Sequence, residues 1–379
     1  MKKLIINFFS LIILFFIGLI ILLSTKGYET DKFNKLISIK ASQTKNINLE
    51  LDTIRFKINP KDLSLFLETQ NPKISFKEIL IPVKNIKVYI DFFSLLKSDI
   101  KIKKASFLLE ELDITQLNKL SLIIKPSNFK SLLNNKVKKG KVISEIEIFL
   151  TEEGKFKDFI AKGTVKDLKV ELLSNLNFTK LNLDFFADRN DILIKNIVGD
   201  LEDLKISNGD IKLNLENGIK LNSNFNSLFN LDERLAKKYH KLFSKYKFTK
   251  NIKNLKANLN NTVSIDFDKT YKIKDYNYII SGVVEHGKFE SSKPIKNNLI
   301  SQEIKEIYFS DFKISTIFRP EKNNFKGNGK YSLNNQDFLS LNLENNYSNN
   351  INYLKLDCDF SNNLNLDFIN YKKDNNKIS

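Results

Sequence analysis

The sequence has 379 residues, of which 42% are hydrophobic and 28% are charged, so its composition is that of a folded chain and excludes a fully disordered one. One cysteine cannot form an internal disulfide, and one cysteine with two histidines argues against a multi-ligand metal site. The net charge of +17 has two interpretations: it attracts anionic lipid headgroups and other polyanions, or it reflects lysines scattered by a composition bias. The sequence has no Arg-rich tract and no interleaved aromatics, so the charge does not indicate a nucleic-acid partner.

An uncharged, mostly apolar stretch covers residues 4–23, directly after Lys2 and Lys3. About 20 apolar residues span a bilayer, whereas the apolar region of a cleaved signal peptide covers only about 7–15 and precedes a small-residue cleavage site. The run here ends in STKG, without such a site. We therefore predict a cytoplasmic N-terminus and uncleaved single-pass transmembrane anchor over 1–27, with the rest of the chain on the other side of the membrane by the positive-inside rule.

After a juxtamembrane segment at 28–45, the chain reads as roughly 18 short strands joined by tight polar turns. The pattern predicts one β-groove in two parts, 46–227 and 248–372, with a frayed tail at 373–379. Between the two parts, 228–247 carries an apolar stripe at helical spacing and a basic opposite side. We expect this amphipathic helix to cover an edge or face of the sheet; the alternative is that it lies on an anionic membrane surface.

The clearest strand signal lies in 161–225, where apolar and polar residues alternate with a period of two. Turn sequences at 188–191, 207–210 and 216–218 separate the strands, and Asn-Gly is a strong hairpin signal. These connections are too short for crossover helices, so an antiparallel meander with one apolar face is predicted. The candidate lipid-facing residues of that face are Leu181, Leu183, Phe185, Ile211, Leu213 and Leu215.

The predicted fold class is mainly β: an N-terminal transmembrane helix, then a long curled antiparallel β-sheet (groove or taco-like), with one amphipathic helix. A large twisted sheet curls. Only one convincing helix is available to cover an apolar face rich in phenylalanine, of which there are 31. This shortage of cover favours an open groove over a closed sandwich or barrel.

The sequence contains no motif for catalysis or cofactor binding. G-x-S-x-G, P-loop, G-x-G-x-x-G, H-E-x-x-H and C-x-x-C patterns are all absent. Carboxylate pairs such as Glu145/Glu147 and Glu152/Glu153 fall at strand-polar or turn positions, where solvated surface is the expected role. We therefore predict no catalytic, cofactor-binding or metal-binding residues, no cofactor, and no enzymatic activity.

The order of strands resembles the AsmA-like family, which includes TamB- and YhdP-type bridge-like lipid-transfer proteins. The resemblance lies in INLELDTIRFKI, in the segment from NPKISFKEIL to FLLEELDI with its SLL turn, and in the meander from GTVKDLKVEL to NLENGIKL. It covers roughly 4–225, and more weakly the rest. It implies an inner-membrane anchor in a Gram-negative envelope, a periplasmic β-groove, and a role in phospholipid movement toward the outer membrane. The chain departs from the long members of that family in its length.

The leading hypothesis is therefore an inner-membrane-anchored periplasmic protein that shields or moves phospholipid along an apolar groove. Its expected partners are phospholipid acyl chains and the inner membrane, with other envelope proteins as further candidates. The alternative is a membrane-anchored envelope scaffold or interaction protein with a closed β-sandwich, which would bind partners by edge-strand addition. A continuous open apolar face would distinguish the first from the second.

Overall fold

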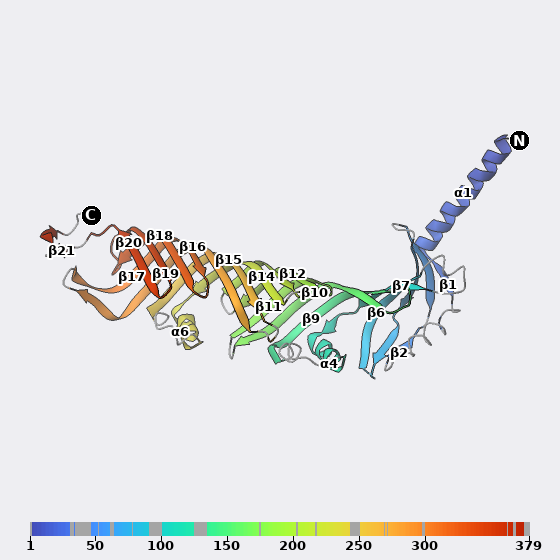
Figure 1. Ribbon diagram of the computed structural model, residues 1–379, viewed down its shortest axis with the longest axis horizontal. Helices are drawn as coiled ribbons and strands as arrows, with labels where there is room; N and C mark the ends of the chain where they lie inside the picture. Colours follow the sequence, from blue (N-terminus) through green and yellow to red (C-terminus); the bar gives the residue numbers. More distant parts are fainter. Residues whose placement is uncertain are drawn as a thin grey trace. The chain divides into compact units, whose positions relative to one another are not determined.

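The structure is a computed structural model of the full chain (Figure 1). It describes residues 2–30, 34, 47–51, 53–60, 64–77, 79–90, 101–124, 135–173, 176–201, 204–216, 218–242, 251–268, 270, 272–297, 300–361, 363–366 and 369–374. Within them the chain is mainly β, with three helices and a long antiparallel sheet that is not closed. This confirms the predicted fold class.

The chain divides into two compact units. Unit 1 comprises Met1–Val170 and Asp184–Asn190, and unit 2 comprises Glu171–Leu183 and Asp191–Ser379. The elements that begin in unit 1 are α1 (Lys2–Thr25), β1 (Tyr28–Thr30), β2 (Ile47–Glu50), β3 (Ile54–Asn59), β4 (Ser64–Gln70), β5 (Lys73–Phe76), β6 (Ile79–Ile90), β7 (Ile102–Leu109), β8 (Leu112–Asp113), α4 (Ile114–Ile124), β9 (Val137–Leu150) and β10 (Phe156–Leu173).

The remaining elements begin with β11, whose residues are divided between the two units. They are β11 (Leu176–Ala187), β12 (Asp191–Leu201), β13 (Leu204–Asn214), β14 (Ile219–Leu231), α6 (Glu233–Leu242), β15 (Ile252–Phe267), β16 (Ile273–Asn297), β17 (Ile300–Phe318), β18 (Lys322–Leu333), β19 (Leu339–Ser348), β20 (Ile351–Cys358), β21 (Leu364–Leu366) and β22 (Tyr371–Lys373).

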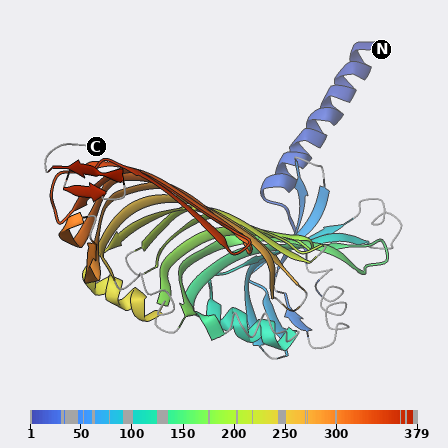
Figure 2. The ribbon, with the colours of Figure 1, turned by 60° about the vertical axis from the view of Figure 1, so that its left-hand side comes forward.

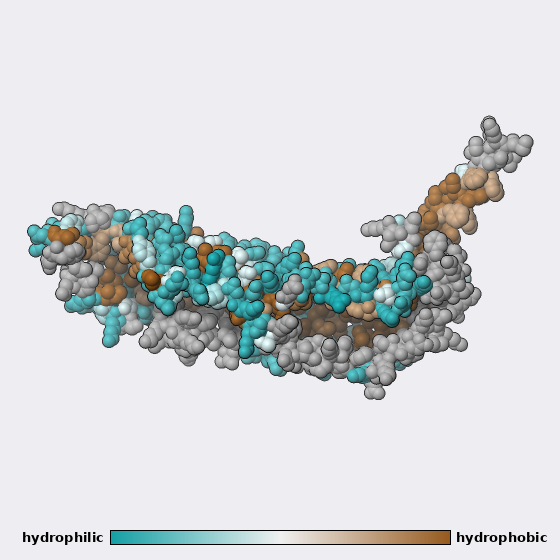
Figure 3. All heavy atoms as spheres, in the orientation of Figure 1, coloured by the Kyte–Doolittle hydropathy of each residue, from teal (hydrophilic) through white to brown (hydrophobic). Residues whose placement is uncertain are grey.

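Helix α1 is long and apolar enough to cross a membrane, and its described apolar side chains are not covered by protein. Figure 3 shows it as a brown, apolar rod. The helix ends where Gly27 adopts a φ of 74° and its N–H donates to the carbonyl of Leu22 at 3.0 Å. The chain then enters β1, which pairs with β3, so Tyr28–Thr30 does not continue the helix.

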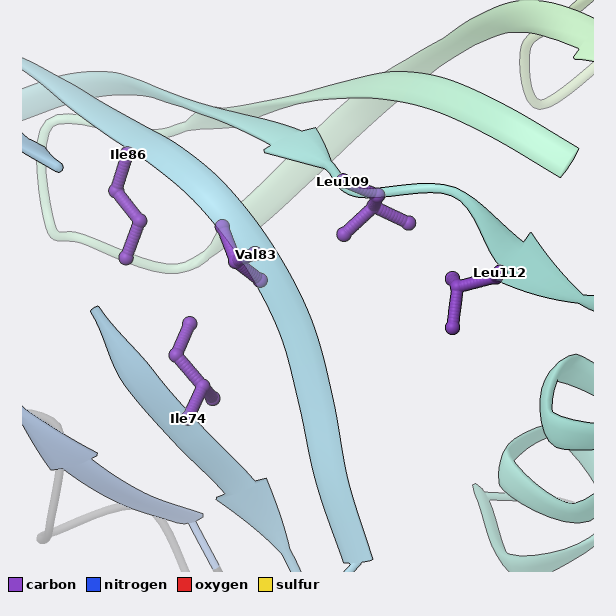
Figure 4. Close-up of a cluster of buried hydrophobic side chains, with 5 residues drawn as sticks. All are labelled: Ile74, Val83, Ile86, Leu109 and Leu112. Carbon is purple, nitrogen blue, oxygen red and sulfur yellow. The ribbon is translucent and has the colours of Figure 1, made fainter. Parts of the chain in front are cut away.

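In unit 1 the strands pair as β1–β3–β4–β6–β7–β9–β10, all antiparallel. Strands β9 and β10 form a hairpin across Glu152-Glu153-Gly154. A core cluster draws its buried members from β5, β6, β7 and β8, and Figure 4 shows these side chains spread along the strands, with Leu112 nearest to a helix. The buried members of this cluster are Ile74, Val83, Ile86, Leu109 and Leu112.

Helix α4 was not predicted from the sequence. The prediction gave one convincing helix after the anchor, at 228–247, and assigned no helix to 114–124, whereas α4 spans Ile114–Ile124 and packs against β8 and β9. Its amphipathic signal is weaker than that of α6 because apolar residues lie around most of its circumference. Within the described residues, α4 and α6 are therefore both available to cover the sheet.

In unit 2 the strands pair in chain order from β12 to β20, again antiparallel. Figure 2 shows these strands bending along their length, so the sheet of this unit has a concave face. Helix α6 packs on β15, with Leu235 and Ala236 buried and the Asp232 carboxylate capping the N–H of Leu235 at 2.8 Å.

The predicted bounds of the amphipathic helix, 228–247, are partly wrong. Residues up to Leu231 belong to β14 and pair with β15, which places Leu231 opposite Leu255. The helix begins at Glu233 instead, because the strand ladder holds the preceding residues in an extended conformation. The end of the predicted helix, 243–247, lies outside the described residues.

One predicted turn is a β-bulge. Residues 207–210 lie inside β13, where Asn208 has a φ of 50° and the pairing shifts between Ser207 and Asp210. Asn-Gly supplies a left-handed residue to a bulge as readily as to a hairpin. The chain reverses earlier, between Leu201 and Leu204, which are paired across the connection. The turns predicted at 188–191 and 216–218 do separate strands.

Candidate functional site: an apolar sheet face

Unit 2 presents one apolar and one polar sheet face, and β15 shows the division most clearly. Ala257 and Leu259 are 1% and 9% exposed, while the intervening Asn258 and the following Asn260 are exposed. Alternation of this kind places successive side chains on opposite sides of the sheet. Figure 3 shows brown, apolar atoms recessed among the teal, polar ones.

The structure places Ile211 and Leu213 in the apolar rows of β12–β14. Ile211 lies opposite Ile194 on β12, and Leu213 lies opposite Leu221 on β14. Both are half-buried. Leu215 follows the end of β13 and is 38% exposed, so it belongs to the turn at the margin of the face.

Leu181 and Leu183 belong to unit 2 and are also half-buried. Leu181 packs over Gly199, where an added Cβ would lie 2.9 Å from its Cδ1. Phe185 belongs to unit 1 and packs over Gly163 in the same way, with its Cε1 2.9 Å from an added Cβ. The six candidate residues therefore divide between the two units, five in unit 2 and one in unit 1.

The apolar face extends beyond the predicted residues into β17, β18 and β19. Phe312, Tyr331 and Leu341 form a buried cluster there. Phe312 lies against Gly327 and Gly329, where an added Cβ would come within 2.3 Å and 2.5 Å of it. Two glycines spaced by one residue on a strand leave room for a large side chain from a neighbouring strand, and this spacing was the sequence signal that could have located the cluster.

A polar cluster interrupts this face at Asn261, which is 3% exposed. Its amide nitrogen donates to the Ser227 hydroxyl at 2.9 Å, and its amide oxygen accepts a hydrogen bond from the Tyr278 hydroxyl at 2.8 Å. Burial raises the pKa of Tyr278, so this phenol stays protonated and remains a donor. The cluster satisfies its own hydrogen bonds and joins β14, β15 and β16 diagonally across the sheet, because Ser227 lies opposite Leu259 and Tyr278 lies opposite Val263.

The opposite face carries cross-strand ion pairs. In unit 2, the Lys288 ammonium lies 2.7 Å from the Glu306 carboxylate, and this hydrogen bond, with one involving Tyr308, raises the pKa of Lys288 to about 12. Most such pairs are largely exposed and contribute little to stability. Their effect is to keep this side of the sheet polar, so the two faces of the sheet differ in chemical character.

A hollow of about 370 Å³ lies over β17–β20, lined mainly by polar-face side chains. Its lysines are matched by acids, with Lys326 3.2 Å from Glu344 and Lys355 3.1 Å from Asp357. The hollow is therefore a charge-balanced part of the polar surface, and it is not part of the apolar face.

No family model matches the chain, and neither a curated protein nor a solved structure is similar to it. The AsmA-like resemblance thus remains an expectation from the sequence. The class of protein that the fold defines is mainly β with an open antiparallel sheet and an N-terminal helix capable of spanning a membrane.

Proposed function

We propose that this protein is anchored in the inner membrane by α1 and shields or moves phospholipid along the apolar face of its sheet toward the outer membrane. The observation that carries the proposal is that apolar side chains on neighbouring strands lie next to one another across a sheet that is not closed. In unit 2, Ile192, Leu213 and Leu221 lie side by side on neighbouring strands, and Leu221 in turn lies opposite Ile265.

Such a face suits an acyl chain for two reasons. Each buried methylene of a lipid tail gains about 0.8 kcal/mol when it leaves water, so a long apolar strip binds hydrocarbon without specific contacts. An open side lets the charged headgroup stay in water, so the desolvation of a phosphate is avoided. The closed β-sandwich of the alternative hypothesis would leave no such side.

Lys2 and Lys3, the first two residues of α1, support the proposed orientation, with the sheet in the periplasm, because positive charge is retained on the cytoplasmic side. The resemblance to AsmA-like proteins supports the same compartment and substrate class. The proposal assigns no catalytic residue, and function rests on the face as a whole.

The test places a photo-crosslinking amino acid, p-benzoylphenylalanine, on one face or the other of the same strand in living cells. Leu213 and Lys212 are neighbours on β13 that point to opposite faces. Radioactive phosphate labels the phospholipid before irradiation, so detergent cannot displace the ligand. We expect labelled adducts at position 213 and background labelling at position 212.

A second experiment tests whether lipid binds to the apolar face. Leu183→Asp should abolish lipid co-purification with the full chain, whereas Asn182→Asp, which places the same charge on the opposite exposed side, should not. Circular dichroism verifies that both variants fold. Equal labelling at 212 and 213, or lipid loading that survives Leu183→Asp in a folded protein, would contradict the proposal.

A further inference from the structure

Strand β20 is an open edge of the unit 2 sheet. It pairs with β19 on one side, and no described strand pairs with the other. All of its residues are exposed, including Ile351 at 71%, Tyr353 at 58%, Leu354 at 57% and Leu356 at 53%. An edge with large apolar side chains on both faces is a template for another strand.

The direction of the backbone groups on β20 follows from its pairing. At its start, the two-residue turn at Asn349-Asn350 has positive φ angles of 51° and 62°, typical of a type I′ hairpin, in which the residues on either side of the turn are hydrogen-bonded to each other. Just after its end, Asp359 donates its N–H to the carbonyl of Ser340 at 3.1 Å. Hydrogen bonding alternates along an antiparallel strand. Residues 351, 353, 355 and 357 therefore bond to β19, while 352, 354, 356 and 358 direct N–H and C=O away from it.

The charges on β20 select one self-complementary register. If two copies pair antiparallel with Leu356 opposite Leu356, then Lys355 lies opposite Asp357 twice, once on each side of the two-fold axis. The same register places Leu354 opposite Cys358 on the apolar face. A shift by one step would place Lys355 opposite Lys355, which is unfavourable.

We propose that β20 pairs with β20 of a second copy of this chain, antiparallel and centred on Leu356. The outward backbone groups supply the ladder, the leucines supply the apolar contact, and the Lys355–Asp357 pairs fix the register. One strand pair buries far less than the roughly 1,200 Å² of a standard interface, so the dimer is weak and depends on concentration. This inference is independent of the proposed lipid function.

The test uses the full chain in membranes with Cys358 replaced by serine, so that an introduced cysteine is the only one. Leu356→Cys should form a disulfide-linked dimer, because facing Cα atoms on paired strands lie about 5.5 Å apart. Lys355→Cys should not, because its counterpart in this register is Asp357. Ile351→Cys, at the exposed far end of the strand, gives the background from random collision.

Charge reversal then tests the register in the Leu356→Cys background. Lys355→Asp places like charges opposite each other and should lower the dimer fraction about tenfold. The double change Lys355→Asp with Asp357→Lys restores opposite charges and should return the dimer. Crosslinking at Leu356 no greater than at Ile351 would overturn the proposal, as would capture of a different protein with no self-dimer. Preferential crosslinking at Lys355 would overturn the register.

Discussion

The carboxylate of Glu68 on β4 lies 2.6 Å from the ammonium nitrogen of Lys57 on β3. Their side chains are only 8% and 16% exposed, and Asn85 donates a further hydrogen bond to Glu68 at 2.8 Å. Burial by itself would raise the pKa of Glu68, but the hydrogen bonds from Lys57 and Asn85 and the charges of Lys57 and Lys87 outweigh it. The pKa of Glu68 in the folded protein therefore lies below 4.5.

This pair predicts a loss of stability in acid. Because the folded pKa of Glu68 is lowered, its stabilisation is complete above the ordinary pKa of 4.5 and is lost as the pH falls through the folded value. Glu68→Gln should flatten the dependence of the unfolding midpoint on pH between 7 and 3. Lys57→Met removes the nearest cation from this buried carboxylate and leaves Lys87 at 3.9 Å, so it should cost up to about 3–5 kcal/mol at pH 7. Urea denaturation of the full chain in detergent measures both.

The matched control for this pair is Glu29→Gln. Glu29 lies 2.9 Å from Arg55 on the neighbouring strand, but its side chain is 61% exposed. An exposed pair contributes about 0–1 kcal/mol, so the control should leave the midpoint nearly unchanged. A similar loss in both variants would mean that burial does not distinguish the two ion pairs.

We predict that removing a hydroxyl from the polar cluster around Asn261 lowers stability more than removing an exposed hydroxyl does. Tyr278→Phe takes away the donor to the Asn261 amide oxygen and should cost about 1–3 kcal/mol, because that buried oxygen then has an unmet hydrogen bond. Ser264→Ala on the polar face removes a hydroxyl that donates to Asn222 at 2.8 Å in an exposed setting and should cost under about 1 kcal/mol. Chemical denaturation compares the two, and equal losses would contradict a special role for the buried cluster.

We predict that no side chain larger than hydrogen fits at position 163, beneath the ring of Phe185. A Cβ at this position would lie 2.2 Å from the carbonyl oxygen of Ile143 and 2.9 Å from the Phe185 ring, so Gly163→Ala forces β9 and β10 apart. We expect a cost of at least about 1–3 kcal/mol. Gly154→Ala is the control: nothing lies within 4 Å of its added Cβ, and its φ of 77° gives a strain cost of about 1 kcal/mol. Thermal unfolding should rank Gly163→Ala as the more destabilised variant.

The proposed orientation predicts which cysteines are labelled from outside the inner membrane. In the Cys358→Ser background, Glu153→Cys in the exposed turn after β9 should react with a membrane-impermeant maleimide once the outer membrane is permeabilised. Lys2→Cys, at the first residue of α1, should react only after the inner membrane is lysed. Labelling of Lys2→Cys in intact cells together with protection of Glu153→Cys would reverse the orientation.

The sequence by itself determined the local features of this protein. The period of two in 161–225 predicts strands, and it places Ile211 and Leu213 on one face because side-chain direction alternates whatever the strand pairs with. The length and apolarity of the N-terminal stretch likewise predict a helix able to span a membrane. These features depend on near neighbours in the chain, so they are readable without the fold.

Only the tertiary structure decided the features that depend on pairing between strands. Asn208-Gly209 suits a hairpin and a bulge equally well, and the ladder with β12 and β14 makes it a bulge. The partner of Glu68, the contact between Phe312 and Gly327, and the open edge at β20 likewise follow from which strands lie side by side. Alternation assigns each residue to a face, but register is a property of two strands, and one strand's sequence does not fix it.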